Sequence, residues 1–224
     1  MFATDSGSPE GLNACPQDGV SPSNSDEISD CYKTKLAYSA LHGDGTQTCN
    51  YDPDSQSYSA NCTDKVIEVC DAGYYLADAE NENPDCDVVG TGYYNGGGST
   101  ERTQCPNGGS TETETSTMVQ QCFKTGLPYE ATYGSGTQRC FYTSGDGADA
   151  IYQRDCDTKV IDSCRGGYWL ENPDDTDCVA VGQNYYSDSG DTSRYACPAN
   201  GKTHGTISDS ILLCYKDGLP YTQA

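Results

Sequence analysis

The chain has 224 residues, of which only 34% are hydrophobic, and that class includes 14 cysteines and 18 tyrosines. So few aliphatic side chains cannot offset the conformational entropy of folding by burial alone. The formal net charge of −22 excludes nucleic acid as a partner, because phosphate binding needs clustered lysines and arginines, and no apolar run is long enough for membrane insertion.

The cysteines recur with a period of about 91 residues, which indicates a tandem repeat. Cys105 follows Cys15 by 90 positions, Cys122 follows Cys31 by 91, and Cys197 follows Cys105 by 92. The chain therefore divides into one six-cysteine repeat at 1–91, a second at 92–183, and the first part of a third at 184–224.

Each repeat opens on an aromatic residue or pair, then a short polar turn, then Cys-Pro, and its middle part predicts a β-hairpin. In the first repeat the hairpin turns at "DPDS", between Cys49 and Cys62, and in the second around "SGDGADA", between Cys140 and Cys156. The two cysteines are 13 positions apart in the first repeat and 16 in the second, because hairpin tips tolerate insertions. With the turn near the midpoint, each pair of cysteines faces across two strands.

An even number of scattered cysteines without a Cys-x-x-Cys pair favours disulfides over zinc, and disulfides persist outside the cytosol. We expect neighbours to pair throughout; the alternative within a repeat is an interlaced pairing of Cys49 with Cys70 and Cys62 with Cys86. The expected pairs are Cys15–Cys31, Cys49–Cys62, Cys70–Cys86, Cys105–Cys122, Cys140–Cys156, Cys164–Cys178 and Cys197–Cys214. Each closed loop of about 15 residues contributes about 3 kcal/mol in the chain-entropy model.

These features predict a small, disulfide-rich, mainly β fold: an elongated tandem array with short hairpins and little helix. The aromatic pair, the Gly/Ser turn and the following "CPNGG" resemble the cysteine-rich modules of tumour-necrosis-factor-receptor-like and ephrin-receptor-like ectodomains, and "CDAGYYL" and "CRGGYWL" resemble EGF-like modules. The resemblance covers about 30 residues of each repeat, and it implies a rod-like extracellular repeat stapled by disulfides.

Aromatic and basic residues also recur in register. The pairs Tyr74/Tyr75, Tyr93/Tyr94 and Tyr185/Tyr186 either form a platform for sugars or stack on disulfides and hairpins, and we favour stacking. Basic residues in a chain this acidic are expected to pair with carboxylates between adjacent repeats. Those in register are Lys33, Lys124, Lys216, Lys65, Lys159, Arg102 and Arg194.

The acidic stretches "DAENENPDCD" and "NPDDTDCV" read as solvated loops, with a loose Ca²⁺ site as the alternative. No arrangement of serine, histidine and aspartate, or of cysteine and histidine, recurs between the repeats. We therefore expect no enzyme activity and no cofactor.

Candidate glycosylation sites lie in two places. Asn61 begins an Asn-Cys-Thr sequon, and "STETETSTM" carries candidates for O-linked sugar at Ser110, Thr111, Thr113 and Thr115.

The third copy of the phrase "GLPY", at Gly218, Leu219, Pro220 and Tyr221, lacks the hairpin that follows the earlier copies. We expect it to be a subunit joint that docks head-to-tail on a second copy of the chain. The alternatives are a piece of a longer array and a frayed tail.

The sequence thus favours a secreted structural repeat protein, a subunit of an extracellular filament, appendage or stalk that binds itself and carries glycans. The rival reading is a ligand-binding or adhesive ectodomain that acts as a monomeric rod.

Overall fold

The structure is a computed structural model that describes residues 2–3, 12–23 and 25–219. The chain divides into two compact units, Met1–Cys122 and Phe123–Ala224. The described residues form β-strands and short 3₁₀ turns and no α-helix, so the predicted disulfide-rich, mainly β fold class is confirmed.

In the order of the chain, the strands in or beginning in the first unit are β1 (Phe2–Ala3), β2 (Leu12–Asn13), β3 (Tyr32–Ser39), β4 (Gly43–Asp52), β5 (Ser57–Cys70), β6 (Tyr74–Tyr75), β7 (Asp87–Val88), β8 (Tyr93–Tyr94), β9 (Thr103–Gln104), β10 (Ser110–Thr111) and β11 (Cys122–Glu130). The others are β12 (Gly134–Ser144), β13 (Ile151–Cys164), β14 (Tyr168–Trp169), β15 (Val179–Ala180), β16 (Tyr185–Tyr186) and β17 (Tyr195–Ala196). The 3₁₀ turns are η1 (Pro16–Asp18), η2 (Ile28–Asp30), η3 (Pro106–Gly108), η4 (Val119–Gln121), η5 (Gly147–Asp149), η6 (Pro198–Asn200) and η7 (Ile211–Leu213).

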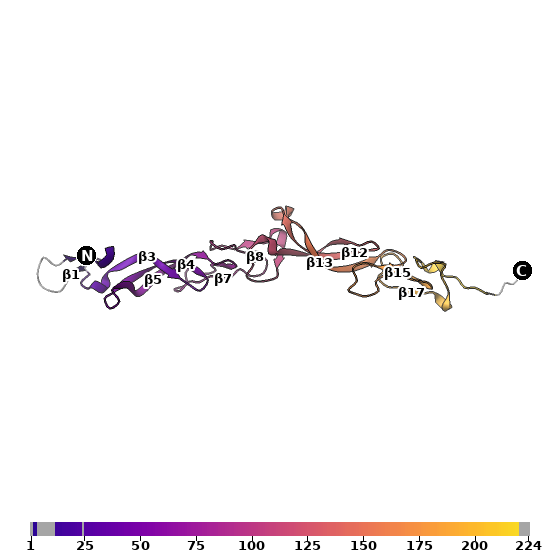
Figure 1. Cartoon of the computed structure of the whole chain (residues 1–224), viewed down its shortest axis with the longest axis horizontal. Coiled ribbons are helices and arrows are strands. Elements are labelled where there is room, and N and C mark those ends of the chain that lie inside the picture. The colour runs from indigo at the N-terminus through magenta and orange to yellow at the C-terminus, as the bar shows by residue number, and fades with distance from the viewer. Residues whose placement is uncertain (1, 4–11, 24, 220–224) are drawn as a thin grey trace. The chain divides into compact units, whose positions relative to one another are not determined.

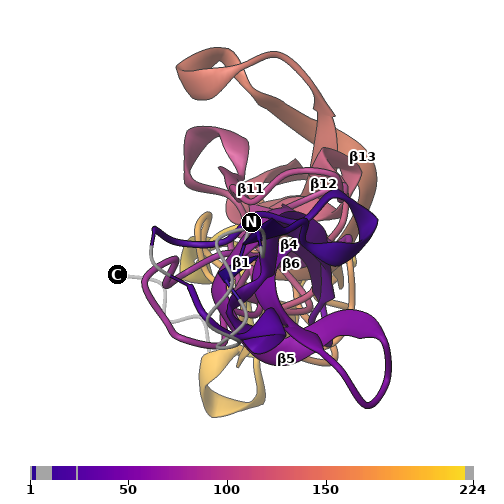
Figure 2. The same ribbon diagram turned by 90° about the vertical axis from the view of Figure 1, so that its left-hand side faces the viewer.

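Each unit contains one antiparallel arrangement of three long strands. β3, β4 and β5 lie side by side in the first unit, and β11, β12 and β13 in the second (Figure 1). The register is the same in both, since Leu36 faces Gln47 where Leu127 faces Gln138. The two expected hairpins are confirmed, and the longer second one, whose tip carries η5, can be followed to the top of Figure 2.

Two glycines let the long strands approach each other closely. A Cβ on Gly45 would lie 1.8 Å from the carbonyl oxygen of Val66, and a Cβ on Gly136 would lie 1.8 Å from that of Val160. Any side chain here would push the central strand away from its neighbour.

All seven disulfides join neighbouring cysteines, as the neighbour pairing predicts, and the interlaced alternative is wrong. They are Cys15–Cys31, Cys49–Cys62, Cys70–Cys86, Cys105–Cys122, Cys140–Cys156, Cys164–Cys178 and Cys197–Cys214.

The hydrophobic cores are small and centred on disulfides. In the first unit Ile67 packs on the Cys70–Cys86 disulfide, with Tyr38 and Tyr74 around it. In the second unit Ile161 packs in the same way on the Cys164–Cys178 disulfide. Sulfur therefore supplies much of the buried apolar surface that aliphatic side chains supply in ordinary domains.

Candidate functional site: the junctions between repeats

The first junction lies inside the first unit, where the end of repeat 1 meets the start of repeat 2. Several backbone hydrogen bonds cross it. Among them, the N–H of Gly73 donates to Asn95 O (2.8 Å), that of Cys70 to Ser99 O (3.3 Å), and that of Leu76 to Thr100 O (2.9 Å). The two repeats are thus joined through paired main chain as well as through the covalent chain.

Asn95 is the centre of this junction and is only 5% exposed. Its Nδ2 donates to Tyr74 O of repeat 1 (2.6 Å) and to Ser99 O of repeat 2 (3.0 Å). Its own N–H donates to the carbonyl oxygen of Ser116 (3.1 Å), a buried residue of the next loop. Asn95 therefore links three segments through its side chain and its backbone N–H.

The loop that follows is tied to the same junction through Thr111. The N–H of Gly92 donates to Thr111 Oγ1 (3.1 Å), which in turn donates to Thr113 O (2.9 Å). The N–H of Gly90 donates to Glu114 O (2.9 Å). These bonds hold the linker between the repeats against repeat 2.

Arg102 contacts both repeats at this junction. Its guanidinium carbon lies 4.1 Å from the ring centroids of both Tyr75, in repeat 1, and Tyr93, in repeat 2. Its Nη1 donates to Val89 O (2.6 Å), whose side chain is fully buried. A planar cation between two ring faces is a favourable arrangement.

The second junction, inside the second unit, has the same construction. The N–H of Gly167 donates to Ser187 O (2.8 Å), where Ser187 takes the place of Asn95. The guanidinium carbon of Arg194 lies 3.9 Å from the Trp169 ring and 4.4 Å from the Tyr185 ring. Its Nη1 donates to Val181 O (3.0 Å). Because both junctions share this arrangement, the arrangement is a feature of the repeat.

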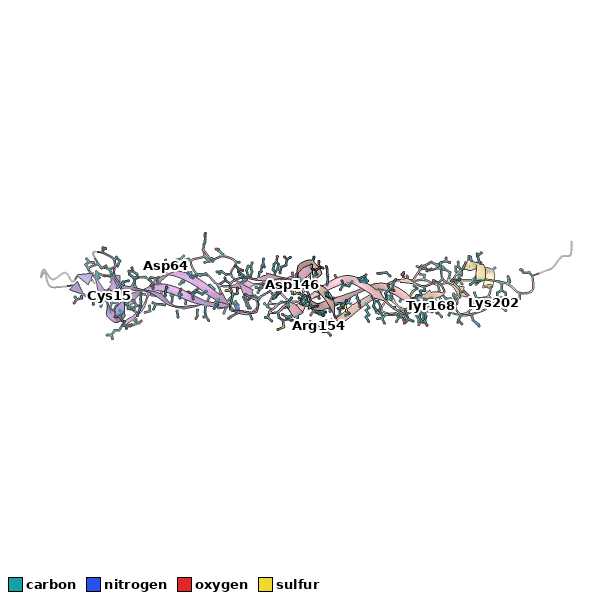
Figure 3. The ribbon with its side chains drawn as sticks, turned by 90° about the horizontal axis from the view of Figure 1, so that it is seen from above. Cys15, Asp64, Asp146, Arg154, Tyr168 and Lys202 are labelled. Carbon is teal, nitrogen blue, oxygen red and sulfur yellow. A yellow bond between two sulfur atoms is a disulfide. The ribbon has the colours of Figure 1, made fainter. Side chains whose placement is uncertain are left out.

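Two further tyrosines also stack on rings of the same chain: Tyr74 of the Tyr74/Tyr75 pair, as predicted, and Tyr168 at the corresponding position of the second repeat. Tyr74 lies on the His42 ring at 3.9 Å between centroids, and Tyr168, labelled in Figure 3, lies on Tyr133 at 4.2 Å. These rings are occupied by contacts within the chain, which leaves little free aromatic face for a sugar platform.

An aspartate fixes the loop before each core disulfide. In the second unit the N–H groups of Thr132, Tyr133 and Cys178 all donate to the Asp177 carboxylate, at 2.8–3.0 Å. Burial opposes ionisation of this carboxyl, but the hydrogen bonds prevail, and the pKa of Asp177 lies below its ordinary value of 3.8. Asp85 accepts from His42 and Cys86 in the first unit.

The prediction that the recurring basic residues pair with carboxylates is wrong. Lys33 donates to Gln17 O (2.9 Å), Lys65 donates to the Asn83 side chain, and Lys159 lies over the Tyr129 ring. Within the described ranges none of the seven forms an ion pair; the ion pairs there are Arg139–Asp157, Arg154–Asp155 and Lys202–Asp217. For Arg102 and Arg194, the aromatic rings and the carbonyl oxygens of Val89 and Val181 are the partners that lie inside the junctions.

The candidate glycosylation residues differ in access. Asn61 is exposed on β5 at a φ of 46°, next to the Cys49–Cys62 disulfide, and Thr113 and Thr115 are exposed. Ser110 is half-buried. Thr111 is 3% exposed and its hydroxyl is held in the junction, so the folded protein has no room for a sugar there.

Of the expected subunit joint, Gly218 and Leu219 are exposed, while Pro220 and Tyr221 lie outside the described residues. No group of three or more metal-ligating side chains occurs in the part of the chain that the structure describes. That part also contains no helix long and apolar enough to cross a membrane.

Compared with known proteins, the chain matches no family model, no curated protein and no solved structure. The resemblance to receptor-like modules therefore stays a prediction.

The role of Arg102 and Arg194 was the main feature missed in the sequence. Their signal was present, because Arg102 and Arg194 each lie nine positions after the first tyrosine of the pair that opens their repeat, Tyr93 and Tyr185.

Proposed function

We propose that this chain is a secreted structural repeat protein, a building block of an extracellular filament, appendage or stalk. It joins with chains built of the same repeat, copies of itself included, and carries glycans at its exposed loops. The observation that supports this best is the junction, which occurs twice with the same arginine, aromatic rings and main-chain bonds.

Such a junction suits a protein that transmits force from one repeat to the next. Flexible linkers let neighbouring modules rotate freely, whereas paired main chain and a stacked arginine must break together before the repeats separate. Disulfide-centred cores suit an oxidising environment outside the cell, where proteolysis of loosened segments is a constant hazard.

Catalysis and a cofactor have no part in this proposal. The recurring arginines and tyrosines are engaged with each other, and every buried side-chain nitrogen and oxygen of the described residues has a hydrogen-bond partner. The carboxylate-rich loops are exposed, where pKa values suited to acid–base chemistry are hard to reach.

Negative-stain electron microscopy of the native, non-reduced protein tests the proposal, with an antibody to the chain as the marker. We expect regular filaments or stalks that carry the marker and fall apart after mild reduction and alkylation. Alkylation without reduction is the matched control and should leave them intact. Dispersed single chains that bind a soluble or cell-surface ligand would instead support the receptor-like reading.

A further inference from the structure

Two tyrosine rings of the second repeat lie face to face. Tyr133, in the turn between β11 and β12, stacks on Tyr168 of β14, with 4.2 Å between the ring centroids and 8° between the ring planes; Tyr168 is labelled in Figure 3. The backbone of Tyr133 is fixed at both ends. Its N–H donates to the Asp177 carboxylate at 2.8 Å, and its carbonyl oxygen accepts from the N–H of Arg165 at 2.9 Å. The fold itself therefore brings the two rings together.

The two phenol hydroxyls lie at the same end of the stack. Burial raises the pKa of Tyr168, and Tyr133 raises it further through its charge and through a hydrogen bond between the two side chains. Because the ring planes are parallel and the hydroxyls are in contact, the carbon ortho to one hydroxyl faces its counterpart on the other ring. Two phenoxyl radicals held in this way need little movement to join through their ortho carbons.

Other aromatic pairs of the chain lack one part of this arrangement. Tyr142 and Tyr152, in the same repeat, meet edge to face with 75° between their planes, so their ortho carbons do not face each other. In the first repeat His42 takes the place of Tyr133 and stacks on Tyr74, with 3.9 Å between centroids and 11° between planes. The first repeat therefore has the same stack with one phenol instead of two.

The pair is open to an oxidant on one side. Tyr133 is 39% exposed, whereas Tyr168 is half-buried against the cluster of the Cys164–Cys178 disulfide. All 14 cysteines are in disulfides, so thiols do not compete for the oxidant. Tyr133 is thus the ring that an oxidant reaches first, and Tyr168 is in direct contact with it.

We propose that Tyr133 and Tyr168 are a site of oxidative modification, at which a haem peroxidase with hydrogen peroxide joins them into a dityrosine. Each phenol gives up one electron and one proton, and the two phenoxyl radicals form a bond between their ortho carbons. The hydrogen on each of these carbons then moves to the oxygen of its own ring, which restores two phenols. The electrons and protons removed reduce one hydrogen peroxide to two waters.

The new bond ties the turn between β11 and β12 to β14. It lies beside the Cys164–Cys178 disulfide, and unlike that disulfide it is not cleaved by thiols. The modification goes beyond the structural function proposed above and does not depend on it, because it concerns two side chains within one repeat.

The test treats the dilute, oxidised, full chain with a haem peroxidase and hydrogen peroxide and follows the fluorescence of dityrosine. After reduction, alkylation and digestion with trypsin, we expect the peptides 125–139 and 166–194 to be linked, with a mass lower than their sum by two hydrogen atoms. Fragment spectra should place the link at Tyr133 and Tyr168. The yield should not change on dilution, because the coupling is intramolecular.

Three variants separate geometry from exposure. Tyr133→Phe keeps a ring in the stack but removes the phenol, so it should abolish this link. Tyr195→Phe is the matched control: Tyr195 is 43% exposed, slightly more than Tyr133, and its loss should leave the link unchanged. His42→Tyr supplies the second phenol in the first repeat, and we expect it to add a link to Tyr74.

Three results would overturn the proposal. One is coupling only between exposed tyrosines of different chains, with Tyr133 and Tyr168 left unlinked. Another is an equal yield of the link in the reduced and alkylated chain, since the fold would then play no part in the reaction. The last is a His42→Tyr chain that has its native disulfides and forms no link to Tyr74.

Discussion

Arg102 connects two repeats through its guanidinium, which contacts one aromatic ring from each of them. Such a group gains from both ring faces and from its hydrogen bond to Val89 O. A single residue therefore couples the two repeats, and substitutions of Arg102 measure the strength of this coupling.

Arg102→Ala should lower the free energy of unfolding by about 2 kcal/mol, from the loss of two cation–π contacts and one hydrogen bond. Urea unfolding of the oxidised chain measures this. Arg102→Lys keeps the charge but cannot stack a planar cation between two rings, so it should recover less than half of the loss. Full recovery with lysine would contradict the stacking account.

The ionisation of Asp177 should make the stability of the folded protein sensitive to acid. Its folded-state pKa lies below the ordinary 3.8, so its contribution to stability is complete above pH 3.8 and is lost as the pH falls toward the lower folded-state value. We expect the stability of the wild-type second unit to fall more steeply below pH 3.8 than that of Asp177→Asn. Chemical denaturation at a series of pH values tests this, and parallel curves would contradict it.

At the scale of elements, the central strand of each long sheet depends on a glycine. Gly136→Ala places a Cβ where it meets the carbonyl oxygen of Val160 at 1.8 Å, so β12 and β13 must separate. We expect a loss of about 3 kcal/mol or more in the free energy of unfolding. Gly205→Ala is the matched control, because no heavy atom lies within 4 Å of its Cβ, and it should be nearly neutral.

The disulfides also differ in how much each should contribute to the stability of the protein. Cys70–Cys86 lies in a buried cluster with Ile67, whereas Cys49–Cys62 links two strands that are already paired by hydrogen bonds. Their loops have similar lengths, 16 and 13 positions, so the chain-entropy terms are similar, about 3 kcal/mol each. Replacing Cys70 and Cys86 by alanine should cost about 1–2 kcal/mol more than replacing Cys49 and Cys62, because it also empties a core. Thermal unfolding of the two double variants gives the comparison, and equal losses would contradict it.

At the scale of the whole molecule, cysteine spacing and turn residues predict most of the fold. The unequal distance between Cys49 and Cys62 and between Cys140 and Cys156 located both hairpins, and the neighbour pairing of all cysteines followed from it. The partners of the recurring basic residues could not be predicted, because net charge favours carboxylates, whereas the folded junction brings rings and carbonyl oxygens closer. The burial of Thr111 could not be predicted either, because the sequence of its loop is polar and typical of an exposed segment. Only the folded chain brings Gly92 close enough to donate a hydrogen bond to the Thr111 hydroxyl.

Each of the two junctions joins neighbouring repeats within one unit, and the proposed structural role depends on them. Hydrogen exchange of the intact, oxidised chain tests them directly at the N–H groups of Gly73, Leu76, Gly167 and Leu170, all of which donate across a junction. We predict that these four amides exchange as slowly as those in the centres of β4 and β12. Fast exchange at the junctions beside slow exchange in the sheets would show that the repeats move independently, and it would contradict the proposed structural role.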